Sequence, residues 1–219
     1  MRRVTTGAIG FARKSSDALK VGYQWRSAEE IGALVDAQQG PTRFDYDPRG
    51  HLIAALLPDG RVQHRASDAV GNLYATVERV DRHYGAGGRL ERANGSEYQY
   101  DSLGQLVEKR LADGAAWKYR WNAAGRLAAV VRPDGGEVRF AYDALGRRVK
   151  KEFEGRTTEY VWDGDDLVHE RERDAEGKLA PMVTWVFEPG TFAPLAKVVG
   201  RVRYGVVTDH LGTPAVLMT

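Results

Sequence analysis

Aspartate recurs through the sequence at places where a carboxylate could take part in acid–base chemistry. Paired carboxylates on either side of a scissile bond are the arrangement that glycosidases use. The recurring positions are Asp47, Asp68, Asp101, Asp143 and Asp163. In the first four the context is the same, Asp-x-x-Gly, and such a context is typical of a turn. A turn role accounts for these aspartates, so the sequence predicts no catalytic residue.

Metal and cofactor sites are not indicated either. The five histidines, His51, His64, His83, His169 and His210, are far apart, and only His64 and His83 could approach one another in a sheet. The acidic run 163–166 resembles a calcium loop, but a glycine takes its second position and no glutamate follows at the twelfth. There is no cysteine, and no glycine-rich phosphate loop precedes a helix. We expect no metal and no cofactor.

Aromatic residues share one phase of the pattern and could form a stripe that stacks on sugars. They are Tyr46, Tyr84, Tyr100, Trp121, Tyr142 and Trp162. A stripe that packs in the core of the protein is the more economical explanation, because aromatic side chains bury large apolar areas.

These residues belong to a repeat with the frame aromatic-Asp-x-x-Gly-x-Leu. The positions that define its clearest copies are Tyr46, Asp47, Gly50 and Leu52; Tyr100, Asp101, Gly104 and Leu106; Trp121, Gly125 and Leu127; and Tyr142, Asp143 and Gly146. Weaker copies begin at Ser67 and Tyr84, and a decayed copy begins at Trp162, with Asp166 where the glycine should be. The copies begin 16 to 21 residues apart, which indicates a tandem-repeat protein with about eight units.

One further copy is inferred from the phase alone. A step of 21 residues back from Tyr46 leads to Trp25, which is followed by Ile31 at the apolar end of the frame. The same segment also reads as a capping box, Ser27-x-x-Glu30, before a helix. The register favours a degenerate repeat over the helix.

The elements that position these residues are strands joined by tight turns. Each repeat has a second turn near its middle, at Pro58-Asp59-Gly60, Ala93-Asn94-Gly95, Ala112-Asp113-Gly114, Pro133-Asp134-Gly135 and Phe153-Glu154-Gly155. Asp-Gly and Asn-Gly favour type I′ turns, with positive φ at both central residues. The intervening segments alternate with period two, as strands do. About sixteen antiparallel strands cannot stay flat, so we predict an all-β fold in which tandem hairpins coil into a curved sheet.

Three regions follow from the pattern. Residues 1–24 are an arm with five basic residues against one acid, residues 25–168 are the repeat sheet, and residues 169–219 begin with a charged connection, His169 to Gly177. Strands are expected at Thr184–Phe187 and Ala196–Val199. The N-terminus only loosely resembles a signal peptide, and no apolar run approaches the length of a membrane span.

The charge pattern predicts no nucleic-acid partner. Lysine and arginine number 32 against 30 acidic residues, for a net charge of +2, and the basic residues are interspersed rather than gathered in a patch. Apolar residues make up 42% of the chain, enough for a sizeable core.

The Tyr-Asp-x-x-Gly-x-Leu frame resembles the YD repeat of the RHS family. A second signal follows in the expected order, because Thr208-Asp209-His210-Leu211-Gly212-Thr213-Pro214 is similar to the signature that opens the RHS repeat-associated core. Within it, Asp209, His210, Leu211, Gly212 and Pro214 are the predicted signature positions. Asp209 belongs to this signature and is not predicted to be a protease residue.

The resemblance implies a hollow β-cocoon like those of bacterial polymorphic toxins, of the C components of ABC toxins and of teneurins. Its implied partners are the remaining core, an enclosed toxin polypeptide, and secretion or chaperone proteins. Its implied route is synthesis in the bacterial cytoplasm and export, often through type VI secretion. Eight repeats fall short of a complete cocoon, so a shell fragment or a truncated orphan form is expected.

Three functions remain open at this point. The first is a non-catalytic shell segment that encapsulates a toxin, the second a module that binds carbohydrate or protein at a cell surface, and the third an enzyme. Exposed strand edges also predict an oligomer or a partner chain.

Overall fold

Strands and tight turns make up almost the whole of the described chain. The structure, a computed structural model, describes residues 21–27, 29–209 and 211–219. The one helical element in these residues is a short 3₁₀ turn, Ala86–Gly88. The molecule divides into two units, residues 1–94 and 95–219, and each is considered by itself.

The first unit contains a five-stranded antiparallel sheet and two smaller hairpins. The sheet strands follow chain order: β1 (Val21–Trp25), β2 (Ile31–Asp36), β3 (Gly40–Tyr46), β4 (Leu52–Leu56) and β5 (Val62–His64). The compressed copies at Ser67 and Tyr84 form shorter pairs: β6 (Ala66–Ser67) with β7 (Leu73–Tyr74), and β8 (Arg82–Tyr84) with β9 (Leu90–Ala93).

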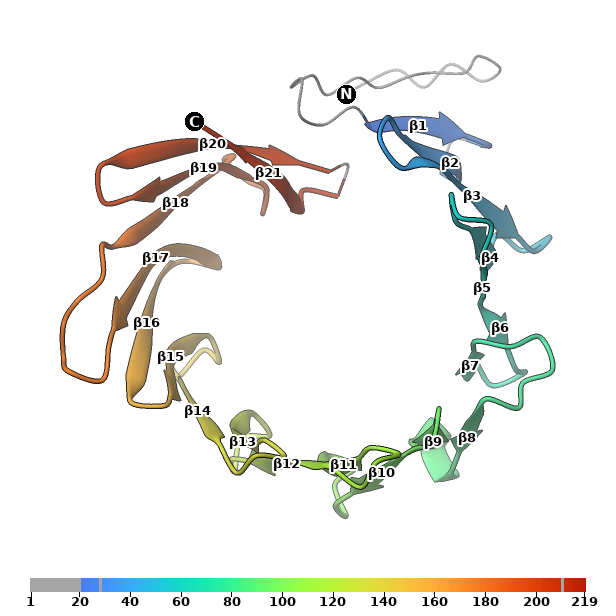
Figure 1. The fold of residues 1–219 in the computed structure, drawn as a ribbon, viewed down its shortest axis with the longest axis horizontal. Coiled ribbons are helices and arrows are strands. Elements are labelled where there is room, and N and C mark those ends of the chain that lie inside the picture. Colours follow the sequence, from blue (N-terminus) through green and yellow to red (C-terminus); the bar gives the residue numbers. More distant parts are fainter. Residues whose placement is uncertain (1–20, 28, 210) are drawn as a thin grey trace. The chain divides into compact units, whose positions relative to one another are not determined.

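The second unit is one curved antiparallel sheet in which every strand pairs with its neighbours in the chain (Figure 1). Its strands are β10 (Ser96–Tyr100), β11 (Leu106–Arg110), β12 (Ala116–Trp121), β13 (Leu127–Val131), β14 (Glu137–Tyr142), β15 (Arg148–Phe153), β16 (Arg156–Asp163), β17 (Asp166–Arg173), β18 (Val183–Phe187), β19 (Pro194–Val199), β20 (Val202–Thr208) and β21 (Pro214–Met218). The predicted all-β fold of tandem hairpins is confirmed. The region boundaries at 24 and 168 stay predictions, although β17 runs through residue 168.

The segment after Trp25 is a hairpin turn and not the start of a helix. Trp25 pairs with Ile31 across β1 and β2, which is the pairing of the repeat frame. The Ser27 hydroxyl does accept a hydrogen bond from the Glu30 N–H at 3.2 Å, but this bond closes the turn. Of the predicted N-terminal arm, residues 21–24 lie in β1, whereas residues 1–20, with the signal-peptide-like stretch, lie outside the described part.

The mid-repeat turns are of two kinds, which corrects the expectation of type I′ throughout. Asn94-Gly95 and Glu154-Gly155 do have positive φ at both residues. At Asp59, Asp113 and Asp134 only the following glycine has positive φ, and the loop contains three residues instead of two. The Asp carboxylate there accepts the N–H two residues on, at 2.9–3.0 Å, which stabilises a type I turn closed by a left-handed glycine.

Aromatic and aliphatic residues gather on one side of the second unit, where Lys109 lies opposite Trp117 and Lys151 opposite Phe140. Tyr119 lies opposite Val130, and Val130 opposite Val138, so these residues share a side with Phe140; we call these four residues the apolar face. On the other side Arg139 lies opposite Glu152. Alternation along each strand produces this separation.

The sheet has almost no core of its own. In the described residues, the buried side chains are five alanines, Tyr23 and Pro194. The aromatic and aliphatic residues of the apolar face are only half-buried. The expected sizeable core is therefore absent, because a single layer of sheet leaves one side of each large side chain uncovered.

Candidate functional site

The aspartate of each motif is an acceptor for backbone N–H groups. The Asp101 carboxylate accepts from the N–H of Leu103 at 3.0 Å and from the N–H of Gln105 at 2.8 Å. The same two bonds recur at Asp47, Asp68 and Asp143, with distances of 2.8–3.0 Å. One carboxylate oxygen thus satisfies two donors that the turn would otherwise leave unpaired.

Asn122 shows that the turn does not need a negative charge. Its side-chain oxygen accepts from Ala124 at 3.0 Å and from Arg126 at 2.9 Å, as the carboxylates do elsewhere. An amide cannot replace a carboxylate as a general acid or base. The shared geometry therefore favours a structural role for this position.

The motif glycine closes the turn in the left-handed region. Gly104 has φ of 82° and donates its N–H to the Asp101 carbonyl at 3.0 Å. Positive φ strains most residues with a Cβ, so glycine is strongly favoured at this position. Aspartate first and glycine fourth is the preferred composition of a type I turn.

The motif aromatic ties each repeat to the one before it. Trp121 Nε1 donates to the carbonyl of Leu106 at 2.8 Å, and the Tyr142 hydroxyl donates to the carbonyl of Leu127 at 2.9 Å. Tyr46 makes the same bond to Ile31 at 2.9 Å. Because the acceptor is always the last residue of the preceding motif, the aromatic supplies both apolar area and a bond between repeats.

The turns also pack on one another along the sheet edge. Gln105 lies over Gly125, and the guanidinium of Arg126 occupies the space that a side chain on Gly146 would need. Arg147 pairs with Asp143 at 2.7 Å and also donates to the carbonyl of Gly164 in the next turn. The residue before the motif leucine therefore reaches over the turn that follows.

Hydrogen bonds to the turn carboxylates favour their ionised form. The pKa of Asp47 is lowered chiefly by the N–H of His51, against some desolvation. The pKa of Asp59 is lowered chiefly by the N–H of Arg61, and next by the Arg61 side chain. Donors that point at the charged form depress a carboxyl pKa, and a general acid at neutral pH needs the opposite shift.

The predicted core signature has the same geometry as a repeat turn. The Asp209 carboxylate accepts from Leu211 at 2.8 Å and from Thr213 at 2.9 Å. Gly212 has φ of 87°, and Thr208 pairs with Pro214 as the motif aromatic pairs with the motif leucine. His210 lies outside the described residues. Asp209 therefore has the same structural role in its turn as Asp101 has in the turn of its repeat.

One further copy of the turn lies at residues 174–179 and was not predicted from the sequence. Asp174 accepts from Lys178 at 2.7 Å, and Gly177 has φ of 86°. Arg173 bridges to Leu179 at the two ends of the turn. The segment expected to be a charged connection is thus strand β17 followed by a repeat turn. The spacing Asp-x-x-Gly-x-Leu at 174–179 was the available signal, and Arg173 in place of the aromatic concealed it.

The histidines and the acidic run do not gather into a metal site. His51 pairs with Asp47 at 3.1 Å, and His169 contacts the Thr184 hydroxyl at 3.0 Å. His64 pairs across strands with Ala54, and His83 with Arg92, so these two histidines are not strand partners. Within the described ranges no group of three or more His, Asp or Glu side chains could hold a metal ion.

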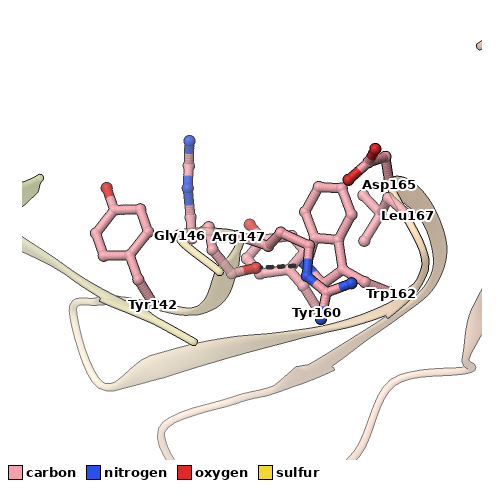
Figure 2. A pocket seen from close by; sticks show the side chains of 8 residues that line it. Tyr142, Gly146, Arg147, Tyr160, Trp162, Asp165 and Leu167 are labelled. Atoms are coloured by element: carbon pink, nitrogen blue, oxygen red, sulfur yellow. Dashed lines mark hydrogen bonds between the residues drawn. The ribbon is translucent and has the colours of Figure 1, made fainter. Parts of the chain in front are cut away.

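One depression on the second unit is lined by polar and aromatic side chains. It has a volume of about 530 Å³, and its lining includes Tyr142, Arg147, Tyr160, Trp162 and Asp165 (Figure 2). It lies beside the decayed motif copy that begins at Trp162.

No helix in the described part of the chain is long and apolar enough to span a membrane.

Comparison with known proteins identifies relatives among toxins. A family model described as teneurin YD-shell matches residues 18–218. Double-stranded DNA deaminase toxin A of Burkholderia cenocepacia is 33% identical over 172 residues, which cover 72% of this chain and 12% of that protein. Probable deoxyribonuclease RhsB of Dickeya dadantii is 30% identical over 215 residues, which cover 83% of this chain and 15% of that protein. Toxin protein Tse5 of Pseudomonas aeruginosa is 29% identical over 234 residues, which cover 86% of this chain and 17% of that protein. The chain thus spans less than a fifth of each of these relatives.

Proposed function

Since this chain belongs to the teneurin YD-shell family, we propose that it is a non-catalytic wall segment of a toxin-bearing protein, whose sheet encloses a polypeptide and helps to deliver it. The observation that carries this proposal is the apolar face of the second unit, Tyr119, Val130, Val138 and Phe140, which has no second layer within that unit. Half-buried aromatic and aliphatic side chains that lie side by side are suited to contact with another chain.

The motif residues support a wall rather than an active site. Their carboxylates, glycines and aromatic tips are all engaged in closing turns or in joining repeats. The motif positions Tyr46, Tyr100, Trp121 and Tyr142, with their aspartates and glycines, are proposed as structural residues, and so are the described signature positions 208–209 and 211–214.

The names of the relatives include a deaminase and a deoxyribonuclease. This chain matches less than a fifth of either protein, so those activities are proposed to reside in other parts of them. For this chain the proposed partners are the rest of the shell and the toxin polypeptide, with secretion machinery or a chaperone during export from the cytoplasm.

The two sides of strand β14 allow a matched test. A photo-cross-linking residue, p-benzoylphenylalanine, is placed at Val138 on the apolar face or at Arg139 on the charged side of the natural gene product. We expect ultraviolet light to cross-link position 138, but not position 139, to a polypeptide segment outside the wall. Equal cross-linking from both positions, or none from position 138, would contradict the proposal.

A further inference from the structure

The side of the second unit opposite to the apolar face changes in character along the sheet. From β10 to β16 its cross-strand neighbours have opposite charges: Glu97 with Arg110, Glu108 with Lys118, Arg139 with Glu152, and Lys150 with Glu159. Such pairs are stable in contact with water. The same side then continues from β16 to β19 through Val161, His169, Thr184 and Val198, which face one another in turn.

Over the last four strands, β18 to β21, this side is aliphatic. We call its residues the aliphatic patch: Val186 opposite Ala196, Val207 opposite Val216, and Val198. The four strands contain no aspartate or glutamate. Val186 is 45% exposed and the adjoining Val161 is 53% exposed. The patch therefore lacks the ion pairs that cover the same side of the earlier strands.

The same four strands are also largely apolar on the side of the apolar face, where Val183 lies opposite Val199 and Val206 opposite Leu217 (Figure 1). An antiparallel sheet with one solvated side alternates apolar and polar residues, whereas strands that are covered on both sides are apolar throughout. The composition of β18 to β21 thus fits a sheet that lies between two layers, and exposed apolar patches mark such contacts.

Arg203 indicates the chemistry of the missing layer. It lies opposite Val198 and is exposed, and among the described residues it forms no hydrogen bond or ion pair. A layer that covers the patch would remove the Arg203 guanidinium from water, and a buried charge is stable only when it is paired. Because the patch itself has no carboxylate, a second copy of the same surface could not pair with Arg203. The covering layer must supply the carboxylate.

The size of the patch indicates how this layer is held. Strands about 4.8 Å apart and same-side residues about 7 Å apart along each strand give the patch an area of roughly 350 Å². A stable contact between separate proteins buries about 800 Å² on each partner. A patch of less than half that area holds a layer that is tethered to it, since the tether raises its effective concentration.

We propose that the aliphatic patch is covered by a segment of the same polypeptide from outside residues 1–219, which packs aliphatic side chains on the valines and pairs a carboxylate with Arg203. This contact lies on the side opposite to the apolar face, so it does not depend on the proposed wall function.

Cross-linking from two positions on this side tests the proposal. The natural gene product carries p-benzoylphenylalanine at Val186 in the aliphatic patch, or at Arg139 among the ion pairs as the matched control. After irradiation of the purified protein, mass spectrometry locates the cross-links. We expect position 186, but not position 139, to cross-link within one molecule to a peptide outside residues 1–219. Cross-linking of position 138 without position 186 would overturn this proposal and leave the wall function standing.

Variants of Arg203 test the charge of the covering layer. Arg203→Glu should reduce the cross-link yield from position 186 about tenfold, because two carboxylates would then meet away from water. Arg203→Lys keeps the charge and should retain most of the yield. Neither change removes a contact among the described residues, so the circular dichroism spectrum should not change. The proposal is wrong if position 186 cross-links to nothing, to a second copy or to another protein, if positions 186 and 139 react equally, or if Arg203→Glu leaves the yield unchanged.

Discussion

The indole Nε1 of Trp121 donates a 2.8 Å hydrogen bond to the carbonyl oxygen of Leu106, which ends the preceding turn motif. Tyr142 makes the equivalent bond to Leu127 through its hydroxyl. Two chemically different donors thus reach the same backbone position in successive repeats. This explains why the first motif position accepts tyrosine or tryptophan, each of which combines a large ring with a polar tip.

Removal of this donor should destabilise the sheet. Trp121→Phe keeps an aromatic ring but leaves the Leu106 carbonyl without that partner, and we expect a loss of about 1 kcal/mol in the free energy of unfolding. Urea denaturation measures it. Trp117→Phe on the same strand is the control, since it removes an equal volume and, among the described residues, Trp117 has no hydrogen bond from its indole. Equal losses for the two variants would show that the bond contributes nothing.

The turn aspartates should tolerate an amide but not a methyl group. Asp101→Asn keeps the oxygen that accepts from Leu103 and Gln105, so we expect a change in unfolding free energy within about 0.5 kcal/mol. Asp101→Ala removes both bonds and should cost about 1–2 kcal/mol. The reciprocal change Asn122→Asp should be neutral. If Asp101→Asn were as damaging as Asp101→Ala, the charge and not the turn would be the essential feature.

Contacts between turns should add to the strain of replacing a glycine. Gly114 and Gly155 have φ of 86° and 74°, but only at Gly155 would a Cβ meet a neighbouring turn, 2.9 Å from the Cβ of Ala175. We expect Gly114→Ala to cost about 1 kcal/mol through backbone strain, and Gly155→Ala at least about 1 kcal/mol more through overpacking. Thermal unfolding of both variants measures the difference. Similar melting temperatures would mean that the turns do not support one another.

Acid should weaken the turns through their carboxylates. The pKa of Asp47 and of Asp59 is lower in the folded protein than in the unfolded chain, so the stabilisation is complete above the unfolded value. It is lost as the pH falls from about 4 through the folded value. We expect the urea concentration at the unfolding midpoint of the wild type to decrease as the pH is lowered below 4. The midpoint of the Asp59→Asn variant should decrease less steeply.

The control for this titration is Glu176→Gln. Among the described residues the carboxylate of Glu176 has no hydrogen-bond or ion-pair partner, so its removal should leave the acid dependence unchanged. A wild-type protein whose midpoint is constant from pH 5 to pH 2.5 would rule out the carboxylate contribution.

Turn residues and strand periodicity predicted the fold because each acts locally. An aspartate three residues before a glycine closes the same turn wherever it occurs, so the motifs at Tyr46, Tyr100 and Tyr142 were sufficient to predict antiparallel hairpins. The copies at Asp174 and Asp209 were harder to identify as repeats, because arginine and threonine replace the aromatic. Their turns form nevertheless, since the N–H groups of Gly177 and Gly212 still donate to the carbonyls of Asp174 and Asp209.

Contacts between repeats could not be predicted, because they depend on register. Whether Asp59 adopts positive φ depends on the number of residues in the loop, which the pairing of Leu57 with Arg61 determines. The bond from Trp121 to Leu106 and the packing of Arg126 on Gly146 join segments 15 to 20 residues apart in the chain. The pairing of Trp162 with Leu167, five residues on instead of six, also depends on register.

The central claim, that this sheet is the wall of a shell around a polypeptide, is tested most directly by limited proteolysis of the natural gene product. The measured quantity is the survival of the polypeptide outside residues 1–219, in the wild type and in the double variant Trp121→Phe/Tyr142→Phe. We predict that this polypeptide resists protease in the wild type and is degraded in the variant under conditions where its weakened wall unfolds. Degradation at the same rate in both proteins would contradict the claim.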